Sequence, residues 1–79
     1  MKKEDLKVGA KITVKKDQKY RIVDIINYEG KDYLFCSTTQ KPIIPMVFEY
    51  REIDDDIRIE LEEDSKILKG IFDKIIANN

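Results

Sequence analysis

The sequence predicts an α+β domain in which a five-stranded antiparallel sheet, twisted or partly closed into a small barrel, carries one C-terminal amphipathic helix. Three observations support this fold class. Apolar and polar residues alternate with the period of two that is typical of strands as far as residue 62. Clusters of Gly and Asp interrupt the alternation where hairpins need turns. From Ser65 onward the apolar residues recur with the period of an α-helix.

The first two strands are expected at residues 11–15 and 20–28, joined by a polar turn over residues 16–19. Alternation places Ile12 and Val14 on one face of the first strand. The second strand carries apolar residues on both faces, which indicates a central or strongly bent strand. The two faces hold Ile22 and Ile26 on one side and Val23 and Ile25 on the other.

A tight hairpin leads to the third strand. Gly30, within the segment Tyr28-Glu29-Gly30-Lys31, can adopt the positive φ angle that a two-residue hairpin turn requires. The third strand is therefore expected over residues 32–38. After it, Pro42 and Pro45 lack the N–H group that a β-ladder needs, so residues 39–45 are expected to form an extended connection or an edge segment.

The fourth and fifth strands are expected at residues 46–51 and 57–62, on either side of an acidic turn at Asp54-Asp55-Asp56. In the fourth strand, Met46, Phe48 and Tyr50 share one face. The fifth strand is apolar at every odd position, which predicts one buried and one solvated face.

The helix is expected from Ser65, because Ile67, Leu68, Ile71, Phe72, Ile75 and Ile76 form one apolar stripe. Asp64 or Ser65 can cap its N-terminus. Gly70 lowers the intrinsic stability of a helix by about 1 kcal/mol relative to Ala, so it indicates either a close contact between helix and sheet or a modestly stable helix.

We expect one domain over residues 1–79, with an ordered part from about residue 6 to residue 77. Its composition, 42% hydrophobic and 39% charged, is typical of a folded chain. The predicted core consists of Ile12, Val14, Ile22, Ile26, Phe35, Phe48, Ile57, Ile59, Leu61, Ile67, Leu68, Ile71, Phe72 and Ile75.

The composition argues against several kinds of site. The chain has no His and one Cys, which excludes His-dependent catalytic triads, the usual Cys/His zinc sites and an internal disulfide. We therefore predict a protein that is not an enzyme, with no catalytic residue, cofactor or metal ion. Asp54-Asp55-Asp56 lacks the alternating ligands and central Gly of an EF-hand loop and is interpreted as a plain turn. Cys36 is expected to be a buried, unreactive thiol.

Acidic residues are concentrated in the second half of the chain, with nine of them between Glu49 and Asp64. One hypothesis is an acidic surface that attracts a basic protein partner. The alternative is a solvated face, a turn and charges that favour the helix dipole. The acidic residues predicted to bind the partner are Glu49, Glu52, Asp54, Asp55, Asp56 and Glu60.

The segment from Lys41 to Phe48 carries more apolar surface than a short edge segment easily hides. Pro42, Ile43 and Ile44 are therefore also predicted to contact a partner, through side chains or through a strand edge. The alternative is that Ile43 or Ile44 closes one end of the core.

A second function class rests on the N-terminal half, where basic and aromatic residues are mixed as in sheets that bind single-stranded nucleic acid. Aromatic residues on strands also commonly pack in a core, so the pattern leaves both interpretations open. The residues concerned are Lys7, Lys11, Lys15, Lys16, Lys19 and Arg21 with Tyr20, Tyr28, Tyr33 and Phe35.

The stretch from Asp24 to Phe35, with its Glu29-Gly30-Lys31 turn and Tyr33 at the start of the returning strand, resembles the YrzB-like family of short uncharacterised bacterial proteins. The order of the later elements agrees, so the resemblance covers residues 20–77. It implies an α+β domain of unknown function from a bacterium or its phage. It implies no activity and no site residues.

These observations favour a non-enzymatic protein-binding module, such as a regulator or phage-type inhibitor, that presents an acidic surface to a basic partner. The alternatives are a small-barrel nucleic-acid binder and a structural subunit that self-associates through the edge of residues 42–48. A cytoplasmic location is expected, because no secretory signal or membrane-spanning stretch is evident and Cys36 is unpaired.

Overall fold

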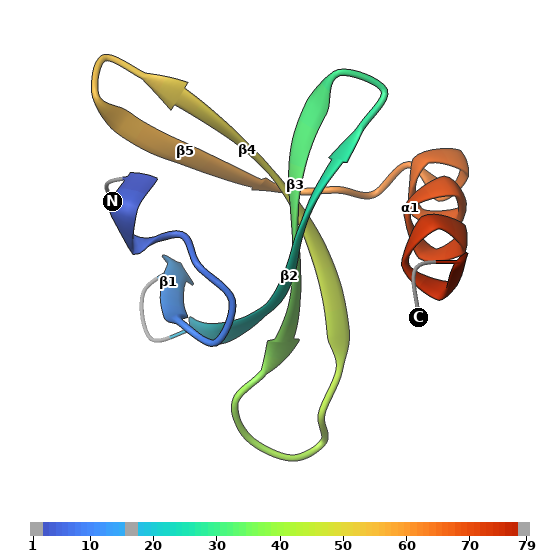
Figure 1. Cartoon of the computed structure of the whole chain (residues 1–79). Helices are drawn as coiled ribbons and strands as arrows, with labels where there is room; N and C mark the ends of the chain where they lie inside the picture. The colour runs from blue at the N-terminus through green and yellow to red at the C-terminus, as the bar shows by residue number, and fades with distance from the viewer. Residues whose placement is uncertain (1–2, 16–17, 78–79) are drawn as a thin grey trace.

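Five antiparallel strands form a nearly closed small barrel, and one C-terminal helix completes the α+β fold that the sequence predicts (Figure 1). The computed structural model describes residues 3–15 and 18–77. Each strand pairs with its neighbour in the chain, so the sheet order is β1-β2-β3-β4-β5. The elements are the short 3₁₀ helix η1 (Lys3–Asp5), the strands β1 (Lys11–Lys15), β2 (Gln18–Tyr28), β3 (Lys31–Thr38), β4 (Pro45–Ile53) and β5 (Asp56–Leu61), and the helix α1 (Ser65–Ala77).

The strand boundaries differ from the predicted ones mainly at the turns. Gln18 and Lys19 belong to β2 and not to the preceding turn, and residues 16 and 17 of that predicted turn lie outside the described residues. Asp56 opens β5, so the acidic turn itself is Asp54-Asp55. Both shifts have the same cause. Antiparallel pairing continues toward the tip of a hairpin wherever the polar residues at the strand ends can remain extended.

A β-bulge in β2 overturns the predicted alternation of that strand. The register with β3 shifts between Ile22, opposite Cys36, and Asp24, opposite Phe35. The extra residue moves every later side chain to the other face. Ile22 and Ile26 therefore lie on opposite faces, whereas Ile25 packs in the same cluster as Ile22.

The inner face of the sheet encloses the barrel core, which continues from β1 through β4. Tyr20 and Phe48 pack with their ring centroids 5.2 Å apart. Met46, Phe48 and Tyr50 all belong to this face, as alternation predicts. The buried members of the barrel core are Ile12, Tyr20, Ile22, Leu34, Cys36 and Phe48.

A second cluster lies between the outer face of the sheet and helix α1, which stands beside the β2–β3 hairpin (Figure 1). The helix buries Ile71 completely, and Phe72 meets Phe35 edge to face at a centroid distance of 5.8 Å. Because β3 lies under the helix and over the barrel core, both of its faces are covered. The buried members of the helix–sheet cluster are Ile26, Tyr33, Val47 and Ile71.

Helix α1 begins and packs as its sequence predicts. Asp64 is the N-cap, because its Oδ1 accepts hydrogen bonds from the backbone N–H groups of Lys66 at 2.9 Å and Ile67 at 3.3 Å. Gly70 marks a close contact with the sheet, since a Cβ at this position would lie 2.0 Å from the Tyr28 hydroxyl oxygen. Near the other end, the Lys74 ammonium group donates to the Asn27 carbonyl.

Leu61 of the predicted core and Ile76 of the predicted apolar stripe are exposed. Leu61 is 45% exposed because it ends β5, which pairs with β4 alone in the described sheet. Ile76 is 72% exposed, so the apolar stripe of the helix ends at Ile75. Among the described residues, no helix is long and apolar enough to cross a membrane.

Candidate functional site at the two ends of strand β4

The two groups of predicted partner-binding residues lie at opposite ends of β4. Pro42, Ile43 and Ile44 belong to the β3–β4 loop, which enters β4 at its first residue. The acidic residues 54 and 55 form the β4–β5 turn at the far end of the strand (Figure 1). The structure therefore divides the predicted site into two separate surfaces, an acidic tip (residues 52–56) and an apolar loop (residues 42–44).

The acidic tip places four carboxylates within five consecutive exposed residues at the end of the β4–β5 hairpin. Asp54 and Asp55 both have positive φ angles, 51° and 65°. Positive φ at both central residues is the pattern of a type I′ turn, whose twist matches that of the flanking strands. Asp tolerates this conformation better than most residues, so part of the acidic run has a local structural cause. Ile53, between the acidic residues, is 40% exposed.

Replacement of Asp55 by glycine is expected to raise the free energy of unfolding by about 0.5–1 kcal/mol, because glycine adopts positive φ without steric cost. Lys31→Gly is the matched control, because Lys31 is an exposed strand residue at which no positive φ is found. The control is expected to lower the stability. Urea denaturation measures both variants, and a loss of stability in Asp55→Gly would contradict the turn geometry.

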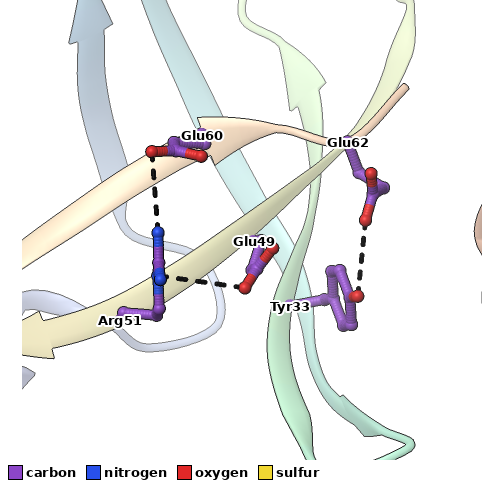
Figure 2. A network of polar contacts seen from close by, with 5 residues as sticks. All are labelled: Tyr33, Glu49, Arg51, Glu60 and Glu62. Carbon is purple, nitrogen blue, oxygen red and sulfur yellow. Dashed lines mark hydrogen bonds and ion pairs between the residues drawn. The ribbon is translucent and has the colours of Figure 1, made fainter. Parts of the chain in front are cut away.

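Glu49 and Glu60 are not part of the acidic tip, because Arg51 lies between them (Figure 2). The Arg51 side chain approaches Glu49 at 3.9 Å and Glu60 at 3.8 Å. These contacts are long and partly exposed, so they contribute little to stability. The single positive charge of Arg51 offsets part of the two negative charges. The exposed carboxylates of the hairpin that Arg51 does not contact lie at residues 52–56.

Tyr33 and Glu62, which no pattern in the sequence connects, form a second polar contact on the outer face of the sheet. The Tyr33 hydroxyl donates to Glu62 Oε1 at 3.4 Å (Figure 2). Tyr33 is 1% exposed, and burial together with the negative charges of Glu62 and Glu49 raises its pKa to about 12. The phenol therefore remains a neutral donor at physiological pH, and it ties the chain at the start of the helix connection to the sheet.

A hollow of 440 Å³ lies between the β2–β3 turn and the end of β4. Tyr50 lines it directly opposite Asp32 in the register of β3 and β4. Burial, followed by the charge of Asp32, raises the pKa of Tyr50. Asp32 is itself held by a hydrogen bond from Asn27 Nδ2 at 3.0 Å. Lys31 and Arg51 also line this hollow, so its charge is mixed.

The apolar loop is ordered by Thr38. Its hydroxyl donates to the Pro42 carbonyl at 2.8 Å and accepts a hydrogen bond from the Ile44 N–H at 2.9 Å. These bonds hold the loop while the Ile43 and Ile44 side chains remain 59% and 48% exposed. The alternative that either isoleucine closes the core is therefore wrong.

Strand pairing covers only part of the predicted edge at residues 42–48. Residues 45–50 pair with β3, and the pairing of β4 with β5 begins at Phe48. In the described register, residues 45–47 thus pair with β3 on one side only, apart from the Val47 carbonyl, which accepts a hydrogen bond from the Glu62 N–H, and Phe48 is paired on both sides. Beside the loop lies an open hollow of 370 Å³, whose lining includes Tyr20, Pro42 and Ile44.

The aromatic residues of the predicted nucleic-acid surface are engaged in packing. Tyr20 belongs to the barrel core, and Tyr33 and Phe35 belong to the cluster beneath the helix. Tyr28 packs against Gly70. Their rings are therefore not presented for base stacking. Lys7, Lys11, Lys19 and Arg21 are exposed, whereas Lys16 and the side chain of Lys15 lie outside the described part of the structure.

Cys36 is fully buried in the barrel core, and burial raises the pKa of its thiol to about 12. The thiol is therefore protonated at physiological pH and unreactive, as predicted. Within residues 3–15 and 18–77, no group of three or more acidic or Cys side chains is arranged to hold a metal ion.

Neither a protein-family model nor a curated protein nor a solved structure matches this chain significantly. The resemblance of residues 20–77 to the YrzB-like family therefore stays a prediction.

Proposed function

We propose that this protein is a non-enzymatic protein-binding module that presents its acidic tip to a basic partner. The observation that carries this proposal is the placement of Glu52, Asp54, Asp55 and Asp56 on the exposed end of a hairpin. Concentrated charge at a projecting position accelerates the encounter with an oppositely charged surface. A regulator or phage-type inhibitor works in this way when it occupies the binding surface of a basic target.

The position of the helix favours recognition through the hairpin. Helix α1 covers the β2–β3 side of the sheet, whereas the β4–β5 hairpin extends away from it (Figure 1). Exposed Ile53 gives the acidic tip an apolar contact as well as charge. Such a combination supports a specific complex, because apolar burial adds affinity to electrostatic steering.

Neutralising the acidic tip is expected to weaken binding at least about tenfold, mainly through slower association. The variant is Glu52→Gln/Asp54→Asn/Asp55→Asn, in which Asn preserves the tolerance for positive φ. The measurement is capture of partners from a lysate of the source cells on the tagged protein, before and after nuclease treatment, followed by association kinetics with the captured protein.

The control Asp24→Asn/Glu63→Gln/Asp73→Asn removes the same charge from exposed positions outside the tip and is expected to bind normally. Equal loss of binding in the two variants would contradict a local role of the tip. Retention of nucleic acid, with partners lost on nuclease treatment, would favour the alternative function of a nucleic-acid binder that uses the basic N-terminal strands.

The exposed isoleucines favour a second candidate, in which the apolar loop is the partner-binding surface. Ile44→Asp is then expected to abolish complex formation and to change the free energy of unfolding by less than about 0.5 kcal/mol, because Ile44 is 48% exposed. Thermal unfolding and the same capture experiment measure the two effects. Normal binding by Ile44→Asp would exclude the loop as the interface.

The buried free thiol of Cys36 also supports the proposal of a cytoplasmic protein, since a reducing compartment leaves single cysteines unpaired.

A further inference from the structure

Strand β5 is the last strand of the sheet and pairs with β4 alone in the described register. Among residues 6–10, none shares a backbone hydrogen bond with residues 57–61. An edge strand of this kind offers N–H and C=O groups to another strand. Leu61, which is 45% exposed at the end of β5, adds uncovered apolar surface.

Residues 57–61 of β5 are complementary to themselves in the antiparallel direction. Its central residue is Ile59, flanked by Arg58 on one side and Glu60 on the other. When two copies pair antiparallel about Ile59, each arginine lies opposite a glutamate and each apolar residue lies opposite an apolar residue. The resulting pairs are Ile57 with Leu61, Arg58 with Glu60, Ile59 with Ile59, Glu60 with Arg58 and Leu61 with Ile57.

The charges of β5 do not match those of β4, the strand with which it pairs inside the chain. Glu60 lies directly opposite Glu49, and Arg58 lies directly opposite Arg51. Like charges in directly opposite positions are unfavourable. Only the diagonal contact of Arg51 with Glu60, at 3.8 Å, offsets them across this strand pair. Arg58 and Glu60 are thus better matched by a second β5 than by β4, whereas Asp56, which lies opposite Ile53 within the chain, would lie opposite Glu62 of the partner subunit.

We propose that this protein forms a two-fold symmetric dimer through its β5 edges, with a second copy of the chain as the partner. A two-fold axis through Ile59 makes the interface isologous and extends the two sheets into one. Charges on edge strands commonly prevent pairing. Such a blocking pattern has no need of self-complementarity, whereas here Arg58 and Glu60 both meet the opposite charge.

Sedimentation velocity on the full chain, from about 10 μM to 1 mM at low ionic strength, tests the proposal. The wild type is expected to show a concentration-dependent monomer–dimer equilibrium. Arg58→Glu and Glu60→Arg each place like charges opposite each other twice in the dimer, so each is expected to weaken dimerisation at least about tenfold. The double variant Arg58→Glu/Glu60→Arg restores the pairing and is expected to restore the dimer.

A mixture of the two single variants gives the most decisive test of the proposed pairing. In the mixed pair, both glutamates of the Arg58→Glu chain face both arginines of the Glu60→Arg chain, so a heterodimer is expected although neither variant dimerises alone. Both variants should remain folded monomers, because each gains an opposite charge facing β4, at Arg51 or at Glu49. Circular dichroism verifies the fold.

A wild type that stays monomeric over the whole range, or a mixture that does not associate, would overturn the proposal. The acidic-tip variant is expected to dimerise normally, because residues 52–55 lie outside the paired segment. A result that contradicts dimerisation can therefore be told apart from a result that contradicts partner binding at the acidic tip.

Discussion

Replacement of Ile71 by alanine is expected to unfold a large part of the protein at moderate temperature. Ile71 is fully buried at the centre of the cluster between helix and sheet. Truncation of a buried isoleucine costs about 2–5 kcal/mol, because it removes apolar contacts and leaves a cavity. A single core of this size supplies only about 3–5 kcal/mol in total. The change therefore removes most of the stability.

The matched control is Ile76→Ala, five residues further along the same helix, at a position that is 72% exposed. It is expected to change the free energy of unfolding by less than about 0.5 kcal/mol. Thermal and urea denaturation followed by circular dichroism measure both variants. Equal, small effects of the two substitutions would contradict a helix that is docked on the sheet.

Gly70→Ala is expected to destabilise the protein by about 1–3 kcal/mol, although alanine is the better helix former. The added Cβ would lie 2.0 Å from the Tyr28 hydroxyl oxygen and 2.4 Å from Tyr28 Cζ, so the ring or the helix must move. The helix also depends on this approach for the Lys74 contact with the Asn27 carbonyl. Glycine at this position therefore stabilises the docked helix through the space that it leaves.

The sign of this effect should reverse when Tyr28 is shortened. In the background of Tyr28→Leu the obstructing ring atoms are gone, and Gly70→Ala is expected to stabilise by about 1 kcal/mol through helix propensity. Urea denaturation of the four members of this double-mutant cycle measures the coupling. An equal effect of Gly70→Ala in both backgrounds would show that Tyr28 is not the cause.

The periodic elements of this fold could be predicted from the sequence, because each long segment keeps one face in contact with a core. The bulge in β2 could not be predicted in this way. Its signal is the two apolar pairs Ile22-Val23 and Ile25-Ile26 on either side of Asp24, which are compatible both with a two-faced strand and with a change of face. Only the pairing with β3 shows that the register shifts after Ile22. The exposure of Leu61 likewise depends on its position at the end of an edge strand.

The turn of the candidate site could be predicted from the sequence, but the ion pairs beside it could not. Asp54 and Asp55 are residues that turns favour, and the alternating strands around them predict a hairpin. The contacts of Arg51 with Glu49 and Glu60 depend on which residues of β4 and β5 face each other. That register follows from the two-residue turn, whose length was overestimated by including Asp56.

The central claim is that recognition occurs at the acidic tip, and a titration followed by ¹⁵N NMR tests it most directly. The labelled protein is titrated separately with two probes of opposite charge. One is a basic peptide rich in Lys and Arg, and the other is a single-stranded oligonucleotide. We expect the peptide to shift the amide signals of residues 52–56 and the oligonucleotide to leave the spectrum unchanged. Shifts caused by the oligonucleotide and confined to exposed basic residues such as Lys11 and Arg21 would contradict the claim and assign binding to the N-terminal strands.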